Sequence, residues 1–162
     1  MTKTVLLKTL KEFTDAAVKD LIMPVAPQKD DGEPPAGRAA DVYMMRLVKS
    51  SAAKKAAPYI IHQAITGRDS QAEGERVTSR ASVRSIFCVY HEDEQEGGLL
   101  LLGLIERLRI ELLKEVVIGN RFELDLEDGL DMLIYPDDSK PYYVGEMLSA
   151  WKMPAVRREV NF

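Results

Sequence analysis

The chain has 162 residues, of which 22 are basic and 26 acidic, and 46% are hydrophobic. A chain of this length makes one ordinary domain that buries roughly 70% of the surface exposed on unfolding. The hydrophobic content excludes disorder throughout, and the net charge of -4 argues against nucleic-acid binding through charge alone. We therefore expect no direct nucleic-acid specificity.

The same sequence limits the cellular setting. The single cysteine, Cys88, cannot form an internal disulfide, which favours a reducing, cytosolic environment. The longest apolar run, residues 99–105, falls far short of the roughly 20 residues that a membrane helix needs. The start of the chain lacks the long apolar stretch of a secretory signal. We expect no membrane partner.

Residues 4–23 have the spacing of an amphipathic helix, with apolar residues every three or four positions and charged residues on the other side. Pro24 ends this predicted helix, because proline lacks an N–H donor. Prolines, glycines and acids then predominate as far as Arg38. This composition predicts a flexible Pro-rich loop over residues 24–41.

Several short segments rich in β-branched and aromatic residues predict strands. They are residues 42–48, 58–66, 77–90, 122–126, 130–135 and 142–153. Apolar or small side chains alternate with polar ones at the start of 77–90, which indicates one solvent-exposed face. Its far end, residues 86–90, is apolar on both faces and predicts a covered, central position in a sheet. The polar stretch 67–75 predicts a loop.

A second helix is predicted to begin after Asp93, whose side chain is expected to accept from a free backbone N–H while Glu96 reaches back. Its apolar stripe is Leu101, Ile105, Leu108 and Leu112, and the expected charge pairs are Glu106 with Arg109 and Arg107 with Glu111. It should end near Lys114 or Glu115. The order of these elements predicts a single α+β domain over residues 1–162, with a mostly antiparallel sheet and two amphipathic helices packed on one face.

Residues 91–96, His-Glu-Asp-Glu-Gln-Glu, combine a possible metal ligand with four carboxylates, and hard cations prefer carboxylate oxygens. The segment lacks the ligand spacing of a calcium hand, and acids suit the positive end of a helix dipole. We favour a helix start, and a small metal-dependent hydrolase or nuclease is the alternative. His62 has no Ser, Cys or acid nearby in sequence to form a relay, so we expect a sheet-face histidine. We assign no catalytic residue, metal ligand or cofactor, and do not expect an enzyme.

Two features suggest contact with a partner. Arg80 and Arg84 share one face of the predicted strand and could meet phosphate or a partner's carboxylates. The alternative is a solvated strand face that protects a sheet edge against aggregation. The aromatic C-terminal strand, which includes Trp151, has more apolar surface than one small sheet easily covers, and this favours a subunit interface.

Two stretches carry a family resemblance. The first is Cys88-Val-Tyr-His-Glu-Asp-Glu-Gln-Glu-Gly-Gly running into Leu104-Ile-Glu-Arg-Leu-Arg. The second is Pro141-Tyr-Tyr-Val-Gly-Glu-Met-Leu-Ser-Ala-Trp-Lys-Met-Pro-Ala. Together they resemble small tail proteins of tailed bacteriophages and prophages, described as tail-completion or tail-terminator proteins. The match covers residues 86–113 and 141–159, and its most specific part is Gly145-Glu146-Met147 with Trp151 and Pro154.

The resemblance implies a structural protein that caps the tail tube as a ring, often a hexamer, and offers a surface for head joining. Its partners would be copies of itself, the tail tube and head-completion proteins, in the host bacterial cytoplasm during assembly and then in the virion tail. The candidate interface residues are Arg80, Arg84, Glu146, Met147 and Trp151. The Pro-rich loop and residues 67–75 are expected to project toward tail or head partners and to order on assembly. Another head-tail connector or minor tail protein, or an adaptor that binds a host protein, are the alternatives.

Overall fold

The computed structural model describes residues 1–27, 35–47, 56–136 and 140–159. The elements in chain order are α1 (Lys3–Val18), β1 (Asp41–Met44), β2 (Tyr59–Ser70), β3 (Thr78–Tyr90), α2 (Glu94–Glu115), β4 (Val117–Ile118), β5 (Phe122–Leu124), β6 (Leu130–Ile134) and β7 (Tyr142–Met153). The fold is α+β, as the sequence pattern predicts.

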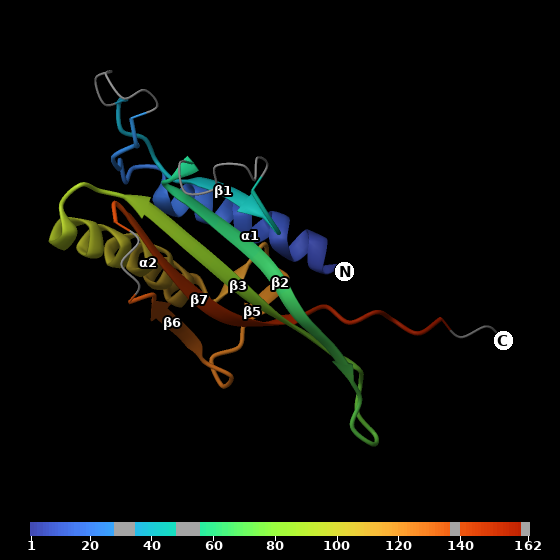
Figure 1. Ribbon diagram of the computed structural model, residues 1–162. Helices are drawn as coiled ribbons and strands as arrows, with labels where there is room; N and C mark the ends of the chain where they lie inside the picture. Colours follow the sequence, from blue (N-terminus) through green and yellow to red (C-terminus); the bar gives the residue numbers. More distant parts are fainter. Residues whose placement is uncertain (28–34, 48–55, 137–139, 160–162) are drawn as a thin grey trace.

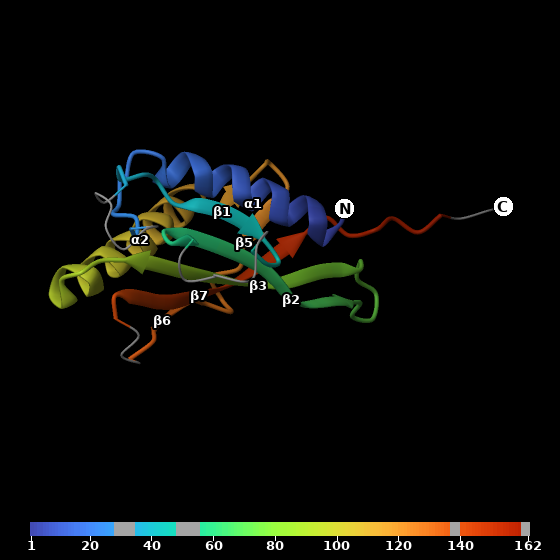
Figure 2. The same ribbon diagram turned by 45° about the horizontal axis from the view of Figure 1, so that its top comes forward.

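The strands form one curled sheet in the order β1-β2-β3-β7-β5-β4, and β6 pairs with β7 as well. The pairing of β1 with β2 is parallel, and the other named pairs are antiparallel. Both helices lie on the same face of this sheet (Figure 1; Figure 2). β3 lies between β2 and β7, which confirms its predicted central position.

The main core fills the space between the helices and the sheet. The predicted stripe of α2 is buried there, together with the apolar side of α1 and alternate residues of β3. Its members include Leu6, Leu10, Val83, Phe87, Leu101, Ile105, Leu108 and Leu112. Because side chains alternate along a strand, the intervening β3 residues Arg80, Ser82 and Arg84 face away from the helices.

A smaller apolar cluster covers one end of the opposite face. It combines side chains of β2 and β3 with residues from the connections that flank β1: Ala26, Ala57, Tyr59, Ile61, Cys88 and Tyr90. This second cluster explains why the far end of β3 is apolar on both sides.

The end of the first helix differs from the prediction. α1 ends at Val18, five residues before Met23. Met23 instead forms two backbone hydrogen bonds with Arg38, of 2.9 and 3.0 Å, which require an extended chain at that point. Residues 28–34 of the predicted Pro-rich loop lie outside the described residues. At its flanks Val25, Ala26 and Ala40 are buried, and the loop boundary at 41 is wrong because Asp41 opens β1.

The start of α2 confirms half of the expected cap. The side chain of Asp93 accepts from the backbone N–H of Glu96 at 3.0 Å. The backbone N–H of Asp93 donates to His91 Nδ1 rather than to Glu96. Along the helix, Glu106 pairs with Arg109 as expected, whereas Arg107 bonds Asp20, two residues after α1, and Glu111 bonds Lys114. Arg107 therefore pairs with a carboxylate outside α2 instead of its predicted partner Glu111.

Two strand predictions need correction. Residues 67–70 belong to β2, so the loop between β2 and β3 is shorter than the polar stretch 67–75 suggested. β1 ends at Met44, four residues before the predicted end at 48, which lies outside the described residues. The two-residue strand β4 was not predicted at all. Its length is too short to give a periodic pattern.

The two adjacent glycines of α2 have opposite surroundings. A Cβ added to Gly97 would overlap the ring of Tyr143 on β7, whereas a Cβ on Gly98 has no atom within 4 Å. We expect Gly97→Ala to lower the free energy of unfolding by about 1–3 kcal/mol, because the tyrosine must leave its rotamer. We expect Gly98→Ala to raise it by about 0.5–1 kcal/mol through helix propensity. Urea unfolding of both variants measures this, and equal effects would contradict the close approach of α2 to β7.

Candidate interaction surface

The face of the sheet turned away from the helices is exposed beyond the second cluster. We call this exposed part the open face. Its residues are Thr66, Arg68, Arg80, Ser82, Arg84, Glu123, Asp131, Leu133, Glu146, Leu148 and Lys152. The long antiparallel pairing of β3 with β7 places these side chains side by side, because cross-strand neighbours point to the same face.

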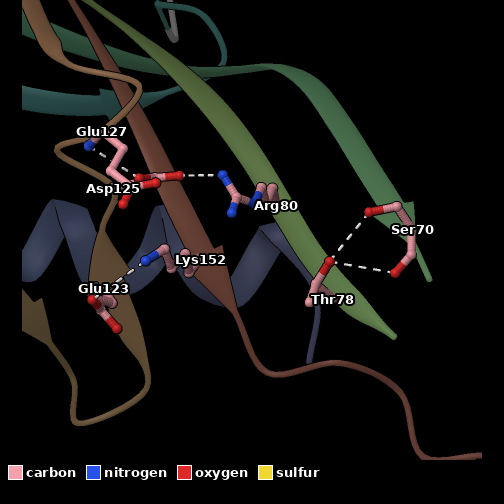
Figure 3. Close-up of polar contacts among 7 residues, drawn as sticks. All are labelled: Ser70, Thr78, Arg80, Glu123, Asp125, Glu127 and Lys152. Atoms are coloured by element: carbon pink, nitrogen blue, oxygen red, sulfur yellow. Dashed lines mark hydrogen bonds and ion pairs between the residues drawn. The ribbon is translucent and has the colours of Figure 1, made fainter. Parts of the chain in front are cut away.

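Arg80 holds a buried carboxylate on this face. Its guanidinium forms an ion pair with Asp125, whose side chain is only 1% exposed, while that of Arg80 is 48% exposed (Figure 3). The other carboxylate oxygen of Asp125 accepts from the backbone N–H of Glu127 at 3.2 Å. The backbone N–H of Asp125 donates to Ala150 on β7 at 2.8 Å. Asp125 thus fixes the turn after β5 against the sheet, and Arg80 neutralises its charge.

Two further contacts hold the same end of the open face. Lys152 on β7 lies 3.7 Å from the carboxylate of Glu123 on β5. The hydroxyl groups of Ser70 and Thr78 lie 3.2 Å apart and join the ends of β2 and β3 (Figure 3). These polar contacts stabilise the sheet at a place that the apolar clusters do not cover.

Arg84 has a different environment from Arg80. Its Nε and one Nη donate to the neutral side chain of Gln63 at 3.1 and 3.0 Å. Glu146 accepts from the hydroxyl of Tyr135 at 2.8 Å. Burial and then this hydrogen bond raise the pKa of Tyr135, and the positive charge of Arg84 partly offsets the increase. Among the described residues, Arg84 and Glu146 thus each have a neutral hydrogen-bond partner and form no ion pair with each other.

Met147 and Trp151 point to the opposite side. Both are buried in the main core, and the indole N–H of Trp151 donates to the hydroxyl of Ser149 at 2.9 Å. Gly145 allows a close approach, because a Cβ there would lie 3.0 Å from Ile105 on α2 and 3.1 Å from the carbonyl of Leu133 on β6. These motif residues support the fold, while Arg80, Arg84 and Glu146 are the candidate interface residues on the surface.

Two open hollows lie near the end of the sheet where β2 leads into β3 and where β7 ends. One, of about 400 Å³, is lined by the open face around Arg68, Arg80 and Asp125. The other, of about 810 Å³, lies between the β2–β3 connection at Gln71 and the segment 154–158 that follows β7. Both combine charged and apolar walls.

The acidic segment 91–96 serves the start of α2 in several ways. Asp93 caps the helix, Glu94 forms an ion pair with Lys140, and Glu92 accepts from the hydroxyl of Tyr90 at 3.0 Å. Burial and then this contact raise the pKa of Tyr90. Over the ranges that the structure describes, no group of three or more His, Cys, Asp and Glu side chains is placed to hold a metal ion. No helix in these ranges is long and apolar enough to cross a membrane.

His62 lies on the core face of β2 and is fully buried. Its ring nitrogens lie 2.8 Å from the hydroxyl of Thr14 on α1 and 2.7 Å from that of Ser85 on β3. Thr14 donates its own proton to the carbonyl of Leu10, so Nε2 donates to Thr14 and Nδ1 accepts from Ser85. The fold therefore brings a serine to His62 that is distant in sequence. The pair is buried in the core, where its hydrogen bonds join α1 to the sheet.

A scan of protein-family models and a search of curated proteins give no match to this chain.

We predict that Arg80 and Arg84 contribute unequally to the free energy of unfolding. Arg80→Ala leaves the buried carboxylate of Asp125 without its ion partner, and we expect the free energy of unfolding to fall by about 1–3 kcal/mol. Arg84→Ala removes contacts with a neutral, half-exposed glutamine, and we expect a change within about 0.5 kcal/mol. Urea unfolding at neutral pH compares the two variants. If both lose the same stability, the ion pair with Asp125 does not set the role of Arg80.

We predict that protonation of His62 lowers the stability of the fold in acid. Burial, and secondarily the charge of Lys11, lower the pKa of His62 to about 3 from its ordinary value of 6.5. The unfolded chain therefore binds a proton that the folded chain does not bind between these values. The contribution of His62 to the free energy of unfolding is therefore fully present above pH 6.5, and it falls by up to about 1.4 kcal/mol per pH unit between pH 6.5 and about 3.

The comparison of wild type with His62→Gln tests this, because the amide keeps hydrogen-bonding groups but does not titrate. Urea unfolding at pH 7.5 and 5.0 should show a smaller pH dependence in the variant. The same slope in both proteins would assign the acid loss to other groups.

Proposed function

We propose that this protein is a structural subunit of a bacteriophage or prophage tail, a tail-terminator or tail-completion protein that forms a ring at the head-proximal end of the tail tube. Its partners would be copies of itself, the tail tube and head-completion proteins. It would act in the host bacterial cytoplasm during assembly and remain in the virion tail. The resemblance of residues 86–113 and 141–159 to such proteins suggests this function.

The exposure of strand β6 is the observation that supports self-association most directly. Met132, Leu133 and Ile134 are 36%, 55% and 38% exposed, and their neighbour Leu148 on β7 is 39% exposed. Proteins that act as monomers usually protect an apolar edge strand with charges, prolines or a covering helix, whereas the three consecutive residues 132–134 of β6 contain neither a charge nor a proline. A subunit of an assembly instead needs this surface for a neighbour.

The sheet also has two unlike edges. In the part of the chain that the structure describes, β6 pairs only with β7, and residues 64–70 of β2 extend beyond the last pairing with β1. A ring forms from head-to-tail contacts between two different surfaces, provided that the rotation between copies closes. Unlike edges on opposite sides of one sheet suit such contacts.

The assembly state tests the proposal. We expect native mass spectrometry of the full chain over a wide concentration range to detect a closed ring of one size, a hexamer in the simplest case. We also expect added protein to bind the ends of isolated tail tubes and to stop their elongation in negative-stain images. Tubes without the protein are the control, because their growth should continue.

Two results would contradict this function. One is a chain that remains monomeric at all concentrations and does not bind tube ends. The other is binding to the head vertex without any affinity for tubes, which would favour another head-tail connector. Mass action allows a dilute monomer to assemble only at the tube end, so the tube-binding assay decides the first case.

A further inference from the structure

The outer edge of β6 is an open site for another strand. This five-residue strand pairs with β7 on one side, so alternate N–H and C=O groups along its other side have no strand partner among the described residues. Its exposed side chains Met132, Leu133 and Ile134 provide apolar surface next to these groups. A strand that adds here would gain both main-chain hydrogen bonds and apolar contacts.

One carboxylate lies in β6 itself, and two more lie in the turn that leads into it from the hollow around Arg80. Glu127 and Asp128 lie in the exposed turn before β6, and Asp131 lies within the strand on the exposed side. Across the described part of the chain, none of these three carboxylates has a salt-bridge partner. An incoming segment should therefore be apolar and positively charged.

The segment that follows β7 has these properties. Residues 154–159 read Pro-Ala-Val-Arg-Arg-Glu and continue away from the sheet without an assigned element (Figure 1). The side chain of Val156 is 77% exposed, and Arg157 and Arg158 are exposed without a salt-bridge partner among the described residues. Pro154 lacks a backbone N–H, but proline is accepted at the first position of an edge strand.

This segment points away from β6 of its own chain. β6 pairs with residues 145–149 of β7, and the segment begins after Met153 at the other end of that strand. At the rise of an extended chain, Val156 lies about 23 Å from Ser149 along the strand direction. The segment would have to reverse its course to reach β6 in the same molecule. The β6 edge of a second copy requires no such reversal.

We propose that residues 154–159 of one copy add as an antiparallel strand to the outer edge of β6 in a second copy. In the favoured register Val156 lies opposite Leu133 and Arg158 lies opposite Asp131. This register follows from the two-residue period of strands, because Asp131 and Leu133 share the open face and Val156 and Arg158 also lie two positions apart. Opposite charges and apolar side chains then face each other across the strands.

A parallel arrangement at β6, or addition to the edge of β2, would match the charged and apolar side chains of the segment less well. A parallel register with Val156 beside Leu133 would place Arg158 beside Tyr135 and leave Asp131 next to proline. The free stretch of β2 contains Arg68 and Asp69, and the side chain of Lys3 lies over Gly67 there, so that two positive charges stand against one negative charge. These positive charges would repel a segment that contains two arginines. The β6 edge is therefore the better acceptor.

This inference rests on the proposed function, because a closed ring needs one donor and one acceptor on every subunit. The donor segment and the β6 edge are different surfaces, so their contact is of the head-to-tail kind. Each copy would give its segment to one neighbour and receive a segment from the other.

Charge exchange between the two positions tests the contact. We expect Asp131→Arg and Arg158→Asp, each alone, to raise the concentration at half-assembly by about fivefold or more, because like charges then face each other. The double variant should return the concentration to near the wild-type value. Native mass spectrometry and light scattering measure assembly, and all three variants change exposed side chains. A double variant as weak as the single ones would overturn the pairing.

Cysteine pairs test the register separately. Partners across a strand pair have the Cα separation that a disulfide requires. A Leu133→Cys chain mixed with a tagged Val156→Cys chain should form the mixed disulfide at least about tenfold faster than an Ile65→Cys chain mixed with the same partner. Ile65 is a matched control because it is also exposed on a strand, at 45%. Equal rates for the two mixtures would overturn the proposed contact.

The experiments distinguish failure of the strand addition from failure of the proposed function. If the wild type assembles or binds tube ends while the charge variants and cysteine pairs show no selectivity, the strand addition is wrong and the proposed function remains. If the wild type also fails to assemble and to bind tubes, both are wrong.

Discussion

The pairing of β3 with β7 is the constraint on which the other features depend. Its register runs without interruption from Ser79 opposite Met153 to Tyr90 opposite Tyr142. A slip of one residue would move every side chain of a strand to the other face. The register therefore decides that Trp151 packs under the helices while Lys152 faces away from them. It also gives β5 and β6 their common support on the outer side of β7.

The helix-bearing face and the open face are stabilised by different means. The first is an apolar core in which the polar chain of Thr14, His62 and Ser85 joins α1 to two strands. The open face depends on ion pairs around β5. In the pair of Arg80 with Asp125 the carboxylate is buried, whereas both partners in the pair of Lys152 with Glu123 are exposed. Polar groups that satisfy one another keep the open face ordered without covering it, so it remains accessible to a partner.

The sequence predicts those surface residues whose position follows from the alternation of side chains along a single strand. The spacing of Arg80 and Arg84 placed both on the same polar face, and the structure agrees. Asp125 was missed, because its burial results from contacts with a residue 45 positions away. The same limit applies to His62, whose serine partner comes from the neighbouring strand. Local patterns contain no information on which distant residue completes a polar contact.

The sequence by itself determined the α+β class, both helices, the N-cap at Asp93 and the long strands β3 and β7, because these features arise from side-chain period and from capping within a few residues. Only the tertiary structure decided that Met147 and Trp151 face the core, that Arg107 bonds Asp20 rather than Glu111, and that β6 has a strand on one side only among the described residues. These outcomes depend on which elements become neighbours. That choice is set by the packing of the whole chain, since each apolar face can be buried against several alternative surfaces.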